Sequence, residues 1–180
     1  MTRYAVPAPG RAALLVPAVS LIAALAGVAY AVLRSREDPQ ALQLAWIALP
    51  VLALVSGLIW LGARRRSVEL DGATLIVRAG PHTRRVPVSE LDLAQARVVD
   101  LDEHTGLRPS IKTLGSALPG YQAGWFRMRD GWRKGYYLLT SRQRVLCLPE
   151  RGGATLLLSL EQPQALLDAL QAVAPRGRSR

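Results

Sequence analysis

The sequence predicts a hairpin of two membrane-spanning helices followed by a mainly-β domain that a single helix closes. Three observations support this fold class. Two long uncharged apolar segments lie near the N-terminus, short runs rich in Val, Leu and Thr follow from Ser67, and an amphipathic segment lies near the C-terminus. The length of 180 residues fits one globular domain with an additional segment. We therefore divide the chain into an N-terminal segment, 1–66, a β domain, 67–174, and a basic tail, 175–180.

The two apolar segments at 12–33 and 41–63 contain no charged residue. Because roughly 20 apolar residues cross a bilayer core as a helix, both are predicted to be transmembrane helices. The linker between them, 34–40, is so short that the helices must form an antiparallel hairpin. Small residues recur every four positions and favour close helix contact, namely Ala23, Gly27 and Ala31 in the first segment and Ala53 and Gly57 in the second. An alternative for the first segment is a signal peptide, with Ala29 to Ala31 resembling a cleavage site.

Arginine placement predicts the orientation of the hairpin. Five arginines flank the two segments and two lie in the linker: Arg3, Arg11, Arg64, Arg65 and Arg66 against Arg34 and Arg36. Since basic residues favour the cytoplasmic side, we predict a multi-pass protein of the plasma (inner) membrane with both termini in the cytoplasm. The single cysteine, Cys147, is compatible with that reducing compartment.

Turn residues divide the region after Ser67 into short strands. Asp71-Gly72 is a hairpin signal, and Gly80-Pro81 is a further turn. We count seven or eight strands, which is typical of a small barrel or sandwich. The runs that predict them are 67–70, 73–80, 82–88, 96–101, 121–129, 135–140, 144–150 and 154–159.

The last element is predicted to be an amphipathic helix over 162–173. Leu166, Leu167, Leu170 and Val173 recur at helical spacing, so one face is apolar. Pro163 suits the first helical turn. Such a helix is expected to cover one open end of the barrel.

Two stretches carry a resemblance to a known family. They are LRPSIKTLGSALPGYQAGWFRMRDG, 107–131, and VLCLPERGGATLLLSLEQPQALLDAL, 145–170. Together with the two preceding apolar segments, this order resembles the bacterial membrane-anchored pleckstrin-homology-like (PH-like) domain family. The resemblance implies a PH-like barrel of about seven strands capped by a C-terminal helix, and a role as an interaction or scaffold module. The sequence departs from the family at Gln162, where an acidic helix cap is more usual.

The sequence gives little support for catalysis. His82 and His104 are the two histidines, and no known catalytic, nucleotide-binding or metal-binding motif occurs. Cys147 alternates with leucines in a predicted strand, as a buried small apolar residue does. We therefore predict no enzyme activity, no cofactor, and no catalytic, cofactor-binding or metal-ligating residue.

The candidate partner-binding residues are Arg108, Lys112, Tyr121 and Trp125. Arg108 and Lys112 fall in 102–120, which has no clear strand pattern and is long for a loop in a compact domain. Tyr121 and Trp125 follow in an aromatic and basic stretch. These aromatics either pack the core or form an exposed binding surface.

Charge favours a membrane partner over nucleic acid. The net charge of the chain is +10, but the part from Ser67 to Arg180 holds 16 basic against 11 acidic residues. Such a mild excess does not predict nucleic-acid binding. Arg64, Arg65 and Arg66 are candidate lipid-facing residues, since basic residues beside a bilayer are attracted to anionic lipid.

These observations predict a membrane-anchored binding or scaffold module that presents a cytosolic barrel to protein partners. The partners expected are the lipid bilayer and other membrane or cytosolic proteins. Two alternatives remain open at this point: a module that senses anionic lipid, and an accessory subunit of a membrane enzyme or transporter. The oligomeric state is left open.

Overall fold

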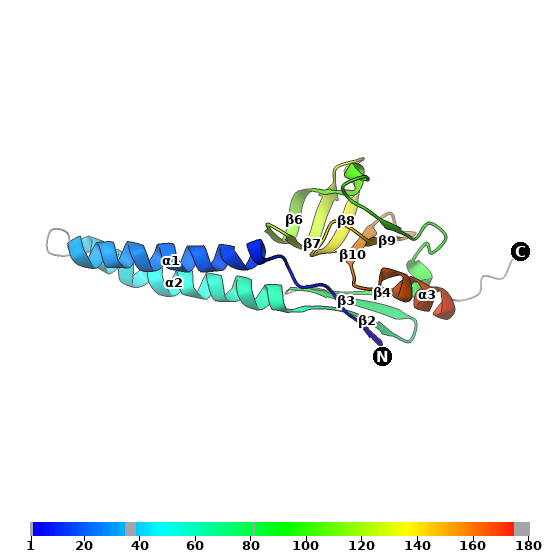
Figure 1. Cartoon of the computed structure of the whole chain (residues 1–180), viewed down its shortest axis with the longest axis horizontal. Coiled ribbons are helices and arrows are strands. Elements are labelled where there is room, and N and C mark those ends of the chain that lie inside the picture. Colours follow the sequence, from blue (N-terminus) through cyan, green and yellow to red (C-terminus); the bar gives the residue numbers. More distant parts are fainter. Residues whose placement is uncertain (1, 35–38, 81, 175–180) are drawn as a thin grey trace, which may run out of the picture.

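A paired helical rod projects from a β domain in the computed structural model, which describes residues 2–34, 39–80 and 82–174. Figure 1 shows the rod on one side and the C-terminal helix on the far side of the domain. The three helices are α1 (Arg11–Arg34), α2 (Pro39–Arg64) and α3 (Pro163–Val173). The predicted basic tail, 175–180, lies outside the described residues.

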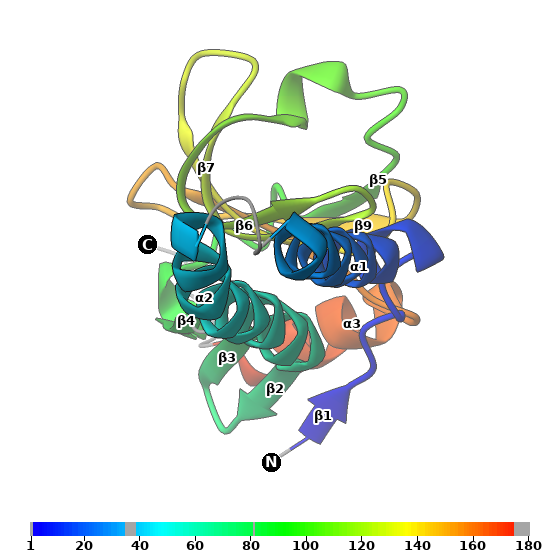
Figure 2. The same cartoon turned by 90° about the vertical axis from the view of Figure 1, so that its left-hand side faces the viewer.

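Helices α1 and α2 run side by side, as the view along the rod shows (Figure 2). Ala31 is buried, and the hydroxyl oxygens of Ser20 and Ser56 lie 3.3 Å apart across the helix pair. The small residues that the sequence suggested for this contact are mostly exposed instead: Ala23, Gly27, Ala53 and Gly57. The two helices therefore pair, and of the small residues named above Ala31 is buried.

The membrane part of the prediction is corrected by this structure. Among the residues that it describes, no helix has the combined length and hydropathy that crossing a bilayer requires. That finding contradicts the transmembrane helices predicted at 12–33 and 41–63 and the multi-pass inner-membrane location with both termini in the cytoplasm. Parts of both predicted spans lie outside the described side chains, namely positions 12, 14, 17, 41, 42, 44, 45, 59, 60 and 63.

Many described side chains of α1 and α2 are nevertheless apolar and exposed. Leu33 and Trp46 are the most exposed, at 82% and 71%. Others that are more than half exposed are Leu15, Val19, Ile22, Leu25, Val32, Ile47, Val51, Leu54 and Leu58. Exposed apolar surface of this kind promotes aggregation, so the experiments below use full-length protein in a non-ionic detergent.

Four strands form the first sheet, in the order β1-β2-β3-β4. Every neighbouring pair is antiparallel. Residue Gly72, with φ of +54°, allows the predicted tight turn between β2 and β3. The N-terminal segment contributes β1, a strand that the sequence did not reveal. The bounds are β1 (Thr2–Tyr4), β2 (Arg66–Asp71), β3 (Thr74–Ala79) and β4 (His82–Pro87).

Six strands form the second sheet, in the order β5-β9-β10-β8-β7-β6. Strands β8 and β10 are parallel, whereas the other neighbours are antiparallel. The bounds are β5 (Arg97–Val99), β6 (Pro109–Leu118), β7 (Tyr121–Met128), β8 (Lys134–Leu139), β9 (Val145–Pro149) and β10 (Thr155–Ser159). Two short 3-10 helices, η1 (Val88–Glu90) and η2 (Thr105–Leu107), lie in the connections.

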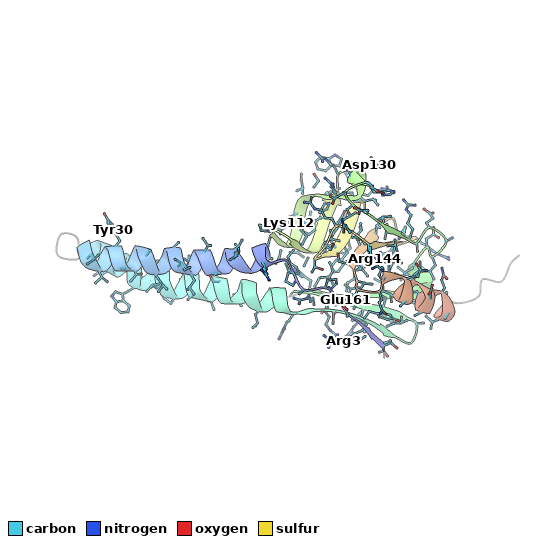
Figure 3. All side chains as sticks on the ribbon, viewed as in Figure 1. Arg3, Tyr30, Lys112, Asp130, Arg144 and Glu161 are labelled. Carbon is cyan, nitrogen blue, oxygen red and sulfur yellow. The ribbon has the colours of Figure 1, made fainter. Side chains whose placement is uncertain are left out.

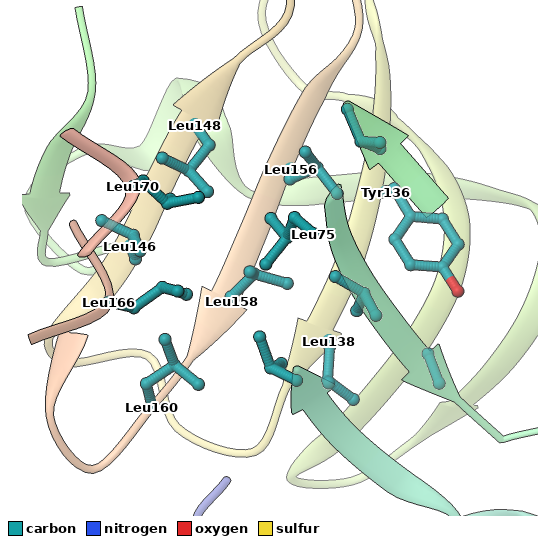
Figure 4. Close-up of a cluster of buried hydrophobic side chains, with 14 of the residues drawn as sticks. Leu75, Tyr136, Leu138, Leu146, Leu148, Leu156, Leu158, Leu160, Leu166 and Leu170 are labelled. Atoms are coloured by element: carbon teal, nitrogen blue, oxygen red, sulfur yellow. The ribbon is translucent and has the colours of Figure 1, made fainter. Parts of the chain in front are cut away.

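The main core lies between the first sheet, the second sheet and α3. Buried side chains of β2, β3 and β4 belong to one cluster with those of β7 to β10. Figure 4 shows Leu166 and Leu170 of α3 beside Leu146 and Leu148 of β9. The amphipathic helix predicted at 162–173 is thus confirmed, and its leucine stripe is buried. Gln162 makes no side-chain cap hydrogen bond, in agreement with its departure from the usual acidic cap.

A second cluster covers the opposite face of the six-stranded sheet. It contains Val99 and Leu101 beside Phe126, Tyr137 and further side chains, with Leu107 of η2 packed against it. The predicted single barrel of about seven strands, with a helix at one end, is therefore wrong. The strands form two sheets, one of six strands with both faces covered and a parallel central pair.

The largest local difference from the sequence prediction is strand β6. Residues 102–120 were expected to form a loop, but ten of them extend as a strand along β7. The pairing contains register shifts between Pro109 and Leu114, and Gly115 and Gly124 face each other with φ of +141° and +116°. Bulges and glycines of this kind obscure a strand pattern in the sequence.

The close contact of Gly115 with Gly124 predicts a sensitive position. A Cβ on Gly124 would lie 2.3 Å from the Leu114 carbonyl oxygen, and its positive φ disfavours other residues. Gly124→Ala should therefore lower the free energy of unfolding by about 2 kcal/mol or more. The control is Gly152→Ala, because a Cβ there meets nothing within 4 Å. Urea unfolding followed by tryptophan fluorescence measures both, and equal stability of the two variants would contradict the close approach of the two glycines.

The buried tyrosines predict a loss of stability at high pH. Burial raises the pKa of Tyr136 to about 12, although the nearby Arg84 partly opposes that shift. The unfolded tyrosine loses its proton near pH 10, so between about 10 and 12 the unfolded state binds fewer protons and is favoured. Unfolding at about pH 9 and about pH 11.5 should show this loss, and Tyr136→Phe should reduce it. Tyr30→Phe, which removes a hydroxyl at an exposed position of α1, is the matched control.

Candidate functional site

The candidate site is the edge of the six-stranded sheet formed by β6. This strand lies at the end of the sheet order and pairs with β7 alone among the described strands. Its ten residues make it much longer than β5, which forms the opposite edge with three. An edge strand presents unpaired backbone N–H and C=O groups to other chains.

Apolar side chains are exposed along this edge and beside it. Ile111 and Leu114 of β6 are 49% and 54% exposed. Trp132, 59% exposed, lies in the turn between β7 and β8 and adopts a positive φ of +54°. The turn is held beside the start of β6, since Arg129 N donates to Arg108 O and Asp130 N donates to Gly106 O, both at 3.0 Å.

The chain around this edge is strongly basic. Between residues 108 and 134 the acidic group is Asp130, whereas the basic residues are Arg108, Lys112, Arg127, Arg129, Arg133 and Lys134. Lys112 is exposed on β6 (Figure 3). Arg127 donates from Nη1 to the Trp132 carbonyl oxygen at 3.0 Å, so this guanidinium is held against the backbone of the turn.

Two of the four predicted partner-binding residues lie on this side of the sheet. Lys112 is exposed, while Arg108 is partly buried and bound within the domain. Its Nε donates to Leu101 O at 2.7 Å, and its Nη2 forms an ion pair with Asp102 at 2.6 Å. Arg108 therefore orders the connection that leads into β6.

The structure turns the other two predicted residues toward the core. Tyr121 is 1% exposed, and burial raises the pKa of its hydroxyl. Trp125 is half-buried and packs edge-on against Tyr136, with ring centroids 5.3 Å apart. The sequence could not decide this, because strand alternation separates two faces without showing which face is covered.

Arg84 fixes the position of Trp125 and connects the two sheets. Its guanidinium lies 4.2 Å from the centre of the Trp125 ring. Its Nη2 donates to both carboxylate oxygens of Glu150, at 2.6 and 2.8 Å. Burial raises the pKa of Glu150, and the Arg84 charge opposes that effect. Because Trp125 is held in this arrangement, it serves the packing between the sheets.

The predicted lipid-facing residues lie where α2 leads into β2. Arg65 is exposed and Arg66 is half-buried in β2, whereas the Arg64 side chain lies outside the described residues. The structure places Arg3 and Arg78 in the same neighbourhood, and sequence reasoning missed both. Pairing of β1 with β2 and of β2 with β3 brings these distant arginines together.

The described side chains that could take part in catalysis or bind a metal ion do not lie together. Cys147 is buried in β9, and burial raises the pKa of its thiol, which disfavours the reactive thiolate. The buried thiol is therefore poorly suited to nucleophilic chemistry. In the ranges that the structure describes, no group of three His, Cys, Asp or Glu residues is arranged to hold a metal ion.

Comparison of the chain with protein-family models, with curated proteins and with solved structures found no match. The resemblance to the PH-like family therefore stays a prediction, and the function has to be argued from the geometry of the chain itself.

Proposed function

We propose that this protein is a non-enzymatic binding module that takes up an extended acidic segment of a partner protein along the edge of β6. The observation that carries the proposal is a ten-residue edge strand with exposed apolar side chains. Addition of a strand to such an edge supplies backbone hydrogen bonds, while alternate side chains provide selectivity.

The positive charge of the β6 edge favours an acidic partner segment. Lys112 lies on β6, the strand of Ile111 and Leu114, and arginines of β7 and its turn add further positive charge to this edge of the sheet. A peptide with alternating apolar and acidic residues complements both features, because its apolar side chains cover Ile111 and Leu114 while its carboxylates lie near the basic side chains. A basic segment is repelled at the same edge.

The irregular start of β6 limits where pairing can occur. Register shifts are confined to Pro109 through Leu114, and the pairs from Leu114 to Leu118 are regular. The lysine and the bulges discourage indiscriminate pairing of edges between copies of the chain. A segment that docks therefore aligns with the regular half, with Trp132 and Ile111 near the irregular half as further apolar contacts.

Three side chains that the sequence analysis singled out are buried or make contacts within the fold. The Cys147 thiol is buried, Arg108 is bonded to Leu101 and Asp102, and Trp125 packs between the sheets. They support the frame of the β6 edge, while Lys112, Ile111 and Leu114 are the exposed side chains that a docked segment would contact. The membrane location that the sequence predicted forms no part of this proposal.

A labelled peptide tests the proposed edge directly. The probe is a synthetic peptide that alternates Val and Glu, and its binding to full-length protein is followed by fluorescence anisotropy. Lys112→Glu should weaken binding about tenfold, because it replaces an attractive charge by a repulsive one. Leu114→Glu should weaken it similarly through loss of apolar contact and added repulsion.

Matched controls lie on the opposite edge of the same sheet. Arg97→Glu and Val98→Glu introduce the same changes on exposed residues of β5 and should leave binding unchanged. A peptide that alternates Val and Lys should not bind. Selective docking on β6 would be ruled out if the β5 and β6 variants lost peptide binding equally. It would also be ruled out if the acidic and basic peptides bound equally well.

A further inference from the structure

A second potential binding region lies on the other sheet, where α2 joins β2. A cavity of about 540 Å³ is lined there by residues of β1 to β4 and of the segment that enters β2. Four of its lining residues are arginines: Arg3, Arg65, Arg66 and Arg78. The carboxylate in the lining is Glu69, so positive charge dominates the cavity.

Strand pairing explains why the arginines converge. Arg3 of β1 lies opposite Glu69 of β2, and Arg78 of β3 lies opposite Ser67. The chain enters this sheet through Arg65, whose carbonyl oxygen accepts a hydrogen bond from Gly80 N at 2.8 Å. The cavity is therefore built on regular strand backbone and a fixed junction. Figure 3 shows Arg3 on the underside of the domain, well away from Lys112.

One carboxylate does not balance this group of cations. Arg78 bonds to Glu69, with Nη1 and Oε2 2.5 Å apart, and its Nη1 also donates to Ser67 Oγ at 3.2 Å. The hydrogen bond from Arg78 lowers the pKa of Glu69, and the charge of Arg3 acts in the same direction. Glu69 thus holds Arg78 in place, while Arg3 and Arg65 are exposed at the same cavity.

From this arrangement we infer that the arginine cavity binds a phosphate-bearing anion. Guanidinium groups present several N–H donors in a planar fork that matches the oxygens of a phosphate. The cavity also carries the Ser67 and Thr83 side chains and the backbone of Gly80, which are compatible with a polar ligand. Its volume is sufficient for a phosphate ester with a small organic group.

The same chemistry is available from two sources, the headgroup of an anionic lipid and a free phosphate ester. Glycerol 1-phosphate in solution is the probe for the free ester. Mixed micelles of detergent with phosphatidylglycerol, compared with micelles containing phosphatidylcholine, are the probe for the lipid. Binding of full-length protein is measured by calorimetry for the former and by changes in tryptophan fluorescence for the latter.

Replacing single arginines by neutral glutamine identifies which of them bind the phosphate group. Arg3→Gln and Arg65→Gln should each weaken binding about tenfold, which is the loss expected for one charge-assisted hydrogen bond. Arg151→Gln removes the same charge from an exposed position outside the cavity and should leave binding unchanged. Urea unfolding of each variant verifies folding, and having two independent arginines keeps the test decisive if one replacement proves destabilising.

The outcomes separate the sources and can overturn the inference. Arginine-dependent binding of glycerol 1-phosphate assigns a free phosphate ester, whereas arginine-dependent binding of phosphatidylglycerol micelles alone assigns a lipid headgroup. Failure of both probes to bind overturns the inference, as does an equal loss with Arg151→Gln or equal binding of phosphatidylcholine. Because the cavity and the β6 edge are tested with different probes and variants, failure of one proposal leaves the other intact.

Discussion

Burial of both faces of the six-stranded sheet is the constraint on which the rest of the structure depends. Every residue of the central strand β10, from Thr155 to Ser159, is buried. One face of its sheet packs against the first sheet and α3, and the other packs beneath the connection that contains Leu101 and Leu107. Because neither face of this sheet centre is accessible, a partner can reach the β domain at a sheet edge or on the outer side of the first sheet.

The same constraint explains which elements the sequence revealed. Strands buried on both faces appear as continuous apolar runs, so 144–150 and 154–159 were recognised. The stripe of Leu166, Leu167 and Leu170 likewise identified α3. Strand β6 was missed because its side chains are largely exposed and its register shifts near Lys112 remove the alternation. The parallel arrangement of β8 and β10 was also missed, since local patterns do not show which strands become neighbours.

The candidate sites were only partly predictable for a related physical reason. Of the candidates, Lys112 is exposed on β6, whereas Tyr121 is buried and Trp125 is half-buried against Tyr136. Alternation cannot distinguish a covered face from a free one, and here both faces carry large side chains. For the cavity, Arg65 and Arg66 were recognised from their local cluster. Arg3 and Arg78 are distant in sequence and reach it through strand pairing, which a local cluster of charges does not show.

The partly buried ion pair of Arg84 and Glu150 joins the two sheets between the two proposed regions. Breaking this pair leaves the Glu150 carboxylate without its bidentate partner, so the pair favours the packing of β4 against the second sheet. Between the edge of β6 and the arginine cavity lies a closely packed apolar core with that fixed contact. The described residues adopt one packing between these regions, and coupling between sites requires two alternative packings. We therefore expect the two proposed regions to bind their ligands independently of each other.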